Sequence, residues 1–139
     1  MKKFLYIFTI IFFLPNSAFA KSEFFKKGVN LFNKNKFDDA KIKFEQDIVF
    51  NPKSELSYLY LSKIFNKKNE TNLEEQNLET VILLNPKNEE AIYNLAKLKL
   101  SSSDYKKSLE LNNKLNLICK NFCSQSKKLK IEIENLSKK

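Results

Sequence analysis

Apolar side chains recur along this 139-residue chain at helical spacing, in stripes that short polar segments interrupt. The first two stripes lie on either side of residues 33–36 and consist of Phe24, Gly28, Leu31 and Phe32, followed by Ala40, Phe44 and Ile48. Apolar residues at three- and four-residue intervals lie on one face of an α-helix. The pattern therefore predicts a helix, a polar turn and a second helix.

The same pattern returns twice further along the chain. The second occurrence is interrupted at residues 66–71, and its stripes contain Tyr58, Leu61, Phe65, Leu78, Val81 and Ile82. The third is interrupted at residues 101–103, and its stripes contain Ile92, Leu95, Ala96, Tyr105, Leu111 and Leu115. Asn72 and Glu75 have the spacing of a capping box, which predicts a helix start at Asn72. Since the sequence has one glycine and three prolines, nothing favours a sheet. We expect three antiparallel helix pairs.

The period of the pattern is 34 residues, because Asn51-Pro52-Lys53 returns as Asn85-Pro86-Lys87. Small residues recur at the same interval at Gly28, Ser62 and Ala96, where a larger side chain would push paired helices apart. We therefore divide the chain into repeats at 21–54, 55–88 and 89–122. Stacked repeats of this kind leave a long surface for a partner.

The two ends of the chain have different roles. Residues 123–139 carry Leu129, Ile133 and Leu136 on one face, which predicts a C-terminal capping helix over the apolar end of the stack. Residues 1–20 have the pattern of a secretory signal peptide, with lysines, an apolar run at 4–14 and Ala18-Phe19-Ala20 as cleavage site. That run spans roughly 16 Å as a helix, too short for a membrane core of about 30 Å. We expect an exported, periplasmic protein that is soluble after cleavage following Ala20.

The charge of the chain is strongly basic, at a formal +9, and neither arginine nor histidine is present. Lysines attract acidic proteins or anionic lipid, but without arginine the chain lacks the side chain that binds phosphates bidentately. We therefore expect no nucleic-acid partner, and we keep an anionic membrane surface as a secondary partner. The alternative is that the lysines only form a solvated face.

The repeats resemble the tetratricopeptide repeat, a 34-residue unit with spaced aromatic, small and proline positions. The first block matches the unit at Phe24, Gly28, Leu31, Phe37, Ala40, Phe44 and Pro52. Glu74 and Ser108 occupy the usual alanine position in the later blocks, and Lys120 stands where the proline would be. The resemblance implies an all-α fold, a right-handed α-solenoid of about three helix-turn-helix units.

Proteins of this family mostly bind peptides or partner proteins in a concave groove, so the resemblance implies a non-enzymatic scaffold or adaptor, here in the cell envelope. Its groove would expose Phe25, Val29, Phe32, Leu59, Tyr60, Lys63, Tyr93, Asn94 and Lys97. A ligand with apolar anchors and acidic character would suit these residues. Of the positions that hold a C-terminal carboxylate in cytosolic chaperone adaptors of the family, only Asn94 fits, so that mode is not expected.

Residues for catalysis are scarce, and we expect no enzyme, cofactor or metal site. There is no histidine, the single glycine excludes Gly-rich phosphate loops, and pairs such as Glu74-Glu75 and Glu89-Glu90 suit helix starts. Cys119 and Cys123 favour a structural disulfide in an oxidising compartment. Free buried thiols, and redox or metal chemistry, are the alternatives.

Two other hypotheses for function remain open. One is peripheral binding to an anionic membrane surface through lysines. The other is a self-associating, homo-oligomeric subunit, joined through an aromatic patch on the first block that contains Phe24, Phe25, Phe32, Phe44 and Phe50.

Overall fold

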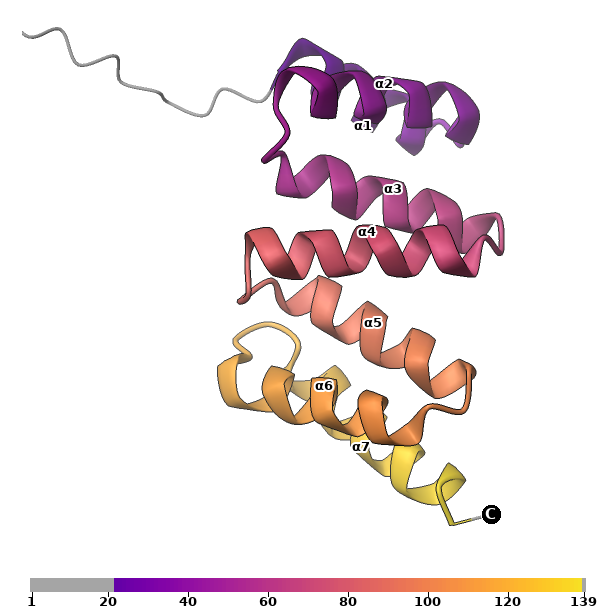
Figure 1. Cartoon of the computed structure of the whole chain (residues 1–139), viewed down its shortest axis with the longest axis vertical. Helices are drawn as coiled ribbons and strands as arrows, with labels where there is room; N and C mark the ends of the chain where they lie inside the picture. The colour runs from indigo at the N-terminus through magenta and orange to yellow at the C-terminus, as the bar shows by residue number, and fades with distance from the viewer. Residues whose placement is uncertain (1–21, 139) are drawn as a thin grey trace, which may run out of the picture.

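The computed structural model describes residues 22–138, and the predicted signal peptide, residues 1–20, lies outside them. The described chain forms seven α-helices and no strand (Figure 1): α1 (Glu23–Asn33), α2 (Phe37–Phe50), α3 (Glu55–Lys67), α4 (Thr71–Leu84), α5 (Glu89–Ser101), α6 (Tyr105–Ile118) and α7 (Cys123–Leu136). Each 34-residue block contains one helix pair, and α7 follows the third. None of these helices combines the length and apolar character that a membrane crossing requires.

The helices stack in chain order into an elongated α-solenoid (Figure 1). The most extensive packing lies within the pairs α1–α2, α3–α4 and α5–α6, and the pairs are joined by contacts of α2 with α3 and of α4 with α5. Helix α7 packs on α6 and touches α5, with Leu129 and Ile133 buried. The stack is therefore closed at its C-terminal end by an amphipathic helix.

The recurring small residues lie where paired helices touch. A Cβ atom on Gly28 would lie 2.7 Å from Cε1 of Phe44, whose side chain is fully buried. Ser62 and Ala96 are buried at the equivalent positions. In the third pair the contact is also polar, because the Ser108 hydroxyl donates to the carbonyl oxygen of Ala96 at 2.8 Å. The close approach that the small residues allow is thus present in all three pairs.

The turns inside the pairs also repeat every 34 residues. Asn35, Asn69 and Ser103 have φ angles of 57°, 58° and 64°, in the left-handed region. This conformation ends the first helix of each pair and reverses the chain. Asparagine adopts it more readily than other non-glycine residues, which explains how the chain makes these turns without glycine.

The loops that follow the second and third pairs are held by glutamates at helix starts. Glu55 accepts hydrogen bonds from the side-chain amides of Asn85, at 3.0 Å, and Asn88, at 2.5 Å. Glu89, one period later, accepts from the backbone N–H groups of residues 120, 121 and 122 at 2.9 Å each. The hydrogen bond from Phe122 N–H is the main reason that the pKa of Glu89 is lowered, aided by the other two N–H groups and Lys120 against the effect of burial.

The loop that Glu89 holds is also closed covalently. Cys119 and Cys123 form a disulfide with their Cα atoms 5.2 Å apart. Since Cys119 follows α6 and Cys123 begins α7, the bond spans the turn into the capping helix. Residues 120–122 are therefore fixed both by the disulfide and by Glu89.

The predicted capping box at Asn72 is wrong. Helix α4 begins at Thr71, so Asn72 lies inside the helix, and the N-cap residue Glu70 makes no side-chain capping hydrogen bond. Glu75 pairs instead with Lys99 of α5, with Oε1 and Nζ 2.5 Å apart. The role of Glu75 is set by a contact between repeats, which cannot be read from the spacing of neighbouring residues.

Candidate functional site

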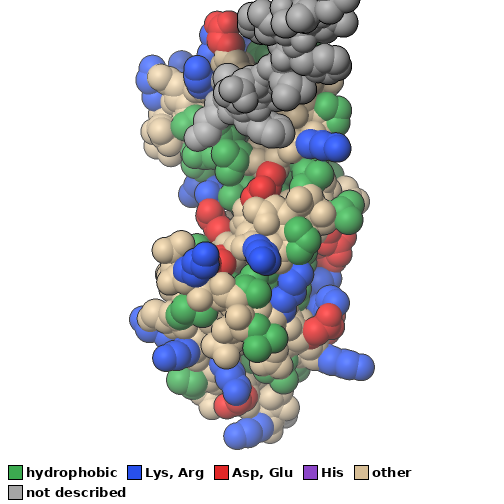
Figure 2. Space-filling model, turned by 90° about the vertical axis from the view of Figure 1, so that its left-hand side faces the viewer, with side chains coloured by type: hydrophobic (Ala, Val, Ile, Leu, Met, Phe, Trp, Pro, Cys, Tyr) green, Lys and Arg blue, Asp and Glu red, His purple; other side chains and the backbone are tan. Residues whose placement is uncertain are grey.

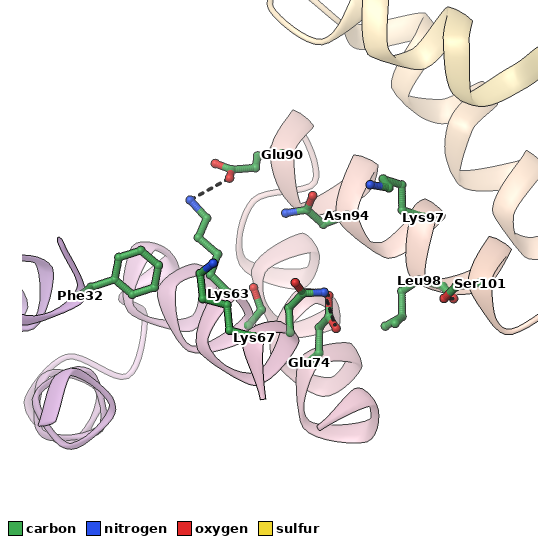
Figure 3. A pocket seen from close by; sticks show the side chains of 11 residues that line it. Phe32, Lys63, Lys67, Glu74, Glu90, Asn94, Lys97, Leu98 and Ser101 are labelled. Carbon is green, nitrogen blue, oxygen red and sulfur yellow. Dashed lines mark hydrogen bonds and ion pairs between the residues drawn. The ribbon is translucent and has the colours of Figure 1, made fainter. Parts of the chain in front are cut away.

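A cavity of about 480 Å³ opens on the inner side of the solenoid between α3 and α5 (Figure 3). Its walls come from α1, α3, α4 and α5, and its lining residues are Phe32, Ser62, Lys63, Asn66, Lys67, Glu74, Glu90, Asn94, Lys97, Leu98 and Ser101. Figure 3 shows Lys63 and Lys67 on α3 across from Asn94 and Lys97 on α5. The first helix of each of the three pairs therefore contributes to this space.

The three lysines of the cavity differ in what they already bind. Lys63 forms an ion pair with Glu90, with Nζ and Oε1 2.7 Å apart. Lys67 and Lys97 form no ion pair within residues 22–138, and each ammonium lies over an aromatic ring, Phe37 at 5.7 Å and Tyr93 at 5.8 Å. Neither lysine is held by an ion pair in the described chain, so both ammonium groups can receive an anionic group of a ligand.

The floor of the cavity contains a buried carboxylate, Glu74. The side-chain amide of Asn66 donates to both of its oxygens, at 3.0 and 3.1 Å. Burial raises the pKa of Glu74, while the hydrogen bond from Asn66 and the charge of Lys97 act in the opposite direction. A glutamate at the position where the repeat usually has alanine is the sequence signal that could have identified this residue.

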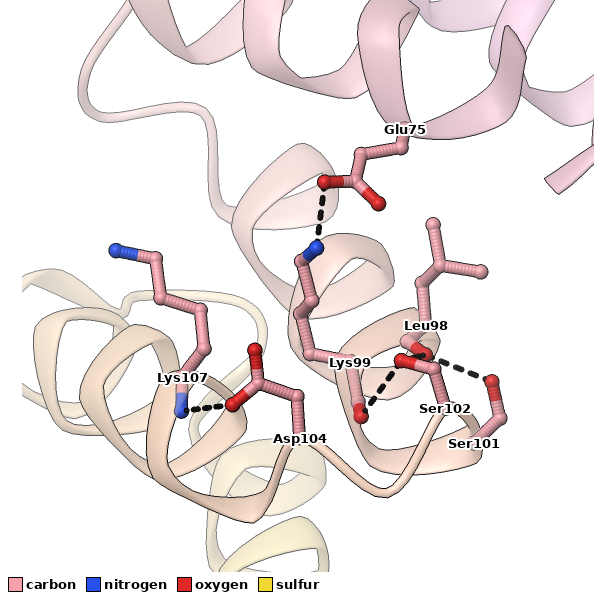
Figure 4. A network of polar contacts seen from close by, with 7 residues as sticks. All are labelled: Glu75, Leu98, Lys99, Ser101, Ser102, Asp104 and Lys107. Carbon is pink, nitrogen blue, oxygen red and sulfur yellow. Dashed lines mark hydrogen bonds and ion pairs between the residues drawn. The ribbon is translucent and has the colours of Figure 1, made fainter. Parts of the chain in front are cut away.

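The neighbouring Glu75 faces away from the cavity and links repeats. Its ion pair with Lys99 joins α4 to α5 (Figure 4). Nearby, Asp104 caps α6 by accepting from the backbone N–H of Lys107 at 3.0 Å, and the hydroxyls of Ser101 and Ser102 donate to the carbonyl oxygen of Leu98. This network stabilises the helix ends, so we assign it no ligand.

A second, more apolar hollow of about 380 Å³ lies between α1 and α3 and is lined by Phe25, Lys26, Val29, Leu56 and Tyr60. The ring of Tyr60 forms one wall and stacks on Phe44 with centroids 4.9 Å apart. It also meets Phe32 edge-on at 5.1 Å, and Phe32 lines the larger cavity. The aromatic pair of Tyr60 and Phe32 therefore connects the two hollows.

For two of the predicted groove residues, the prediction that they are exposed is wrong. Phe25 is only 5% exposed and packs against Phe44, with ring centroids 5.8 Å apart, although its edge lines the apolar hollow. Leu59 is 4% exposed and belongs to the core with Leu78 and Val81. Helical spacing identifies the inner helix but does not tell which flank of it faces the next helix.

The other predicted groove residues are at least partly exposed but divide between three places. The larger cavity holds Phe32, Lys63, Asn94 and Lys97, whereas the apolar hollow holds Val29 and Tyr60. Tyr93 lies against Phe122 of the disulfide loop, with centroids 5.5 Å apart. Sequence reasoning missed Asn66, Lys67, Glu74 and Glu90, which lie on α3, α4 and α5.

The aromatic patch predicted for the first block is smaller than expected. Phe44 and Phe25 are buried, and Phe32 packs edge-on against Phe37 and Tyr60. Phe24 stacks on the exposed Phe50, with ring centroids 5.4 Å apart. In residues 22–138 no group of three histidine, cysteine or acidic side chains is arranged to hold a metal ion.

Comparison with known proteins gives structural relatives only. No family model matches the sequence, and no curated protein matches it. Among solved structures, the type III secretion chaperone SycD of Yersinia enterocolitica in complex with a peptide of the translocator YopD is 15% identical, with 84% of this chain and 92% of that chain covered and a TM-score of 0.73.

Two further solved structures have the same arrangement of helices. The TPR2B domain of yeast Sti1, in a pHsp70 complex, is 14% identical, with 82% of this chain and 95% of that chain covered and a TM-score of 0.75. The first TPR of Spaghetti (RPAP3), bound to HSP90 peptide SRMEEVD, is 12% identical, with coverages of 84% and 91% and a TM-score of 0.74. With the 34-residue period, these likenesses show that the chain has the tetratricopeptide-repeat fold.

Proposed function

We propose that this protein is a non-enzymatic scaffold that binds an acidic, partly apolar peptide segment of a partner protein along its inner groove. The observation that carries the proposal is the pair of lysines without an ion pair in the described residues, Lys67 and Lys97, which line one cavity from two different repeats. Several proteins of this fold were solved with peptides bound, as the SycD and RPAP3 complexes illustrate. The fold supports a peptide ligand, and these two lysines support an acidic residue in it.

In this proposal the apolar hollow binds an apolar side chain of the peptide, and the larger cavity binds an acidic one. An apolar side chain of the ligand would enter the hollow at Val29 and Tyr60, where burial against aromatic rings supplies most of the affinity. An aspartate or glutamate would lie between Lys67 and Lys97, with the Asn94 amide as a further donor. The lysines would also steer the encounter with an acidic partner.

The place of action in this proposal is the periplasm. It rests on the signal-peptide pattern of residues 1–20 and on the disulfide between Cys119 and Cys123, a bond that persists in oxidising compartments. A scaffold there would hold proteins of the cell envelope together. The repeat fold is suited to this because its binding surface extends over several units.

The proposal is tested by capture of partners from the envelope fraction of the source organism, using a Lys67→Glu/Lys97→Glu variant. A matched control, Lys34→Glu/Lys106→Glu, makes the same change of net charge at exposed positions outside both hollows. We expect the groove variant to lose a small set of proteins that the wild type and the control both retain. Equal recovery by all three would contradict the groove as binding site.

A further inference from the structure

The four most exposed large apolar side chains of the described residues lie at equivalent ends of three helices. They are Val49, Phe50, Leu83 and Leu117, with exposed fractions of 74%, 73%, 80% and 86%. Each lies within the last two residues of α2, α4 or α6, and positions 49, 83 and 117 are separated by one repeat. The same outward apolar position has therefore been kept three times on one edge of the solenoid.

Lysines accompany these apolar residues in each repeat. Lys53, Lys87 and Lys120 lie in the loops that follow the three helix pairs. All three are exposed, and none forms an ion pair within residues 22–138. The three loops lie along one edge of the stack, on the left in Figure 1. Figure 2 views the molecule from this side and shows lysines, apolar side chains and some acidic side chains interspersed along it.

Most acidic residues near this edge have a hydrogen-bond or ion-pair partner. Glu55 and Glu89 are held by the loops through hydrogen bonds. Glu45 pairs with Lys41 at 3.2 Å and Glu23 with Lys27 at 2.8 Å. Glu79, one helical turn before Leu83, is exposed and forms no ion pair within residues 22–138. In the part of the chain that the structure describes, lysines without an ion pair, at 53, 87 and 120, therefore outnumber glutamates without one along this edge.

We propose that this edge, defined by Val49, Phe50, Leu83, Leu117 and Lys53, Lys87, Lys120, docks the protein on an anionic lipid bilayer. The lysines would contact lipid phosphates while the apolar tips enter the boundary between headgroups and acyl chains. A bilayer fits better than a protein partner because the exposed apolar side chains are spread along the edge over three repeats, with a lysine in the loop after each. A fluid surface accepts separate tips in a row, whereas a protein would need a matching pocket for each.

The edge and the groove are separate surfaces. None of the seven edge residues lines the cavity between α3 and α5 or the hollow between α1 and α3. A protein docked by this edge can therefore keep its groove open to a peptide. The inference does not depend on the proposed peptide binding.

The test is sedimentation of the processed protein with vesicles of phosphatidylcholine and phosphatidylglycerol at low salt. The edge-lysine variant is Lys53→Gln/Lys87→Gln/Lys120→Gln, and its control of equal net charge is Lys34→Gln/Lys36→Gln/Lys106→Gln at the opposite ends of the helices. We expect the edge variant to bind roughly a hundredfold more weakly, since each lysine near the surface contributes about a factor of five. The control should lose much less.

A second variant, Val49→Ser/Leu83→Ser/Leu117→Ser, tests insertion without any change of charge. These side chains are exposed, so circular dichroism should show an unchanged fold, and binding should weaken roughly tenfold. No binding of the wild type to anionic vesicles, equal losses for the two lysine variants, or full binding by the serine variant would each overturn the proposal. So would capture by the edge of a protein partner with no affinity for vesicles.

Discussion

The first and third repeats fill the same buried position with different chemistry. Phe44 and Asn112 are two periods apart, and both are fully buried. Phe44 packs its ring on Gly28 and Tyr60, so the first repeat depends on shape. Asn112 accepts a hydrogen bond from Ser126 of α7 at 3.0 Å, so the third repeat ties its core to the capping helix. A 34-residue period therefore conserves geometry without conserving the kind of interaction that holds it.

The largest loss of stability is expected when the buried side chain at position 44 is truncated. Phe44→Ala removes a buried ring and should lower the free energy of unfolding by about 3–5 kcal/mol. Asn112→Ala removes a smaller group and strips the Ser126 hydroxyl of its side-chain partner, which should cost about 1–3 kcal/mol. Urea denaturation of both variants measures the difference. A larger loss at Asn112 would show that the polar link outweighs the aromatic packing.

The fit between α1 and α2 is the next target. A Gly28→Ala variant would place its Cβ 2.7 Å from the buried Phe44 ring and should destabilise by about 1–3 kcal/mol. This loss outweighs the gain in helix propensity of about 1 kcal/mol. Ser62→Ala, at the same position of the second repeat, is the control and should change thermal stability far less. Similar melting temperatures for Gly28→Ala and the wild type would contradict the tight packing.

Removal of the disulfide should lower stability by about as much as Gly28→Ala. In the Cys119→Ser/Cys123→Ser variant the free energy of unfolding should fall by about 2 kcal/mol, because the short loop is no longer closed in the unfolded chain. Hydrogen exchange should quicken at the N–H groups of residues 120–122, which Glu89 holds. Reduction of the wild type should reproduce both changes. Unchanged exchange in this loop would show that Glu89 alone suffices to order it.

The smallest effect is expected at Glu74. Because burial raises its pKa, the folded state holds this proton more tightly than the unfolded state, and the resulting stabilisation is present below the unfolded pKa near 4.5. It is lost as pH rises through the folded pKa. Glu74→Gln should therefore gain stability relative to the wild type as the pH rises above the unfolded pKa. A difference that is constant with pH would contradict the raised pKa.

The helices could be predicted from the sequence because apolar spacing and the 34-residue echo are local signals. The groove could be predicted only in part. Phe25 and Leu59 turned out to be buried, because a helix of the inner layer has two packed flanks and the period does not say which faces the ligand. Lys67 was missed because its place opposite Lys97 depends on how α3 and α5 are stacked.

The loop contacts were beyond sequence reasoning for a related reason. Glu89 has the position of a helix-start acid, and only the stacking of α5 against the α6–α7 loop makes it an acceptor for three N–H groups. Glu75 likewise has the spacing of a capping residue but pairs with Lys99 in the next repeat. The roles of both glutamates are set by contacts with residues 24 or more positions away in the chain.

The most direct test of groove recognition is selection from a displayed library of random peptides. We predict that the wild type enriches peptides that combine an acidic residue with a nearby large apolar residue. Lys67→Glu/Lys97→Glu should no longer bind them, while Lys34→Glu/Lys106→Glu should. Enrichment of peptides without acidic residues, or equal binding by the two charge variants, would contradict the account.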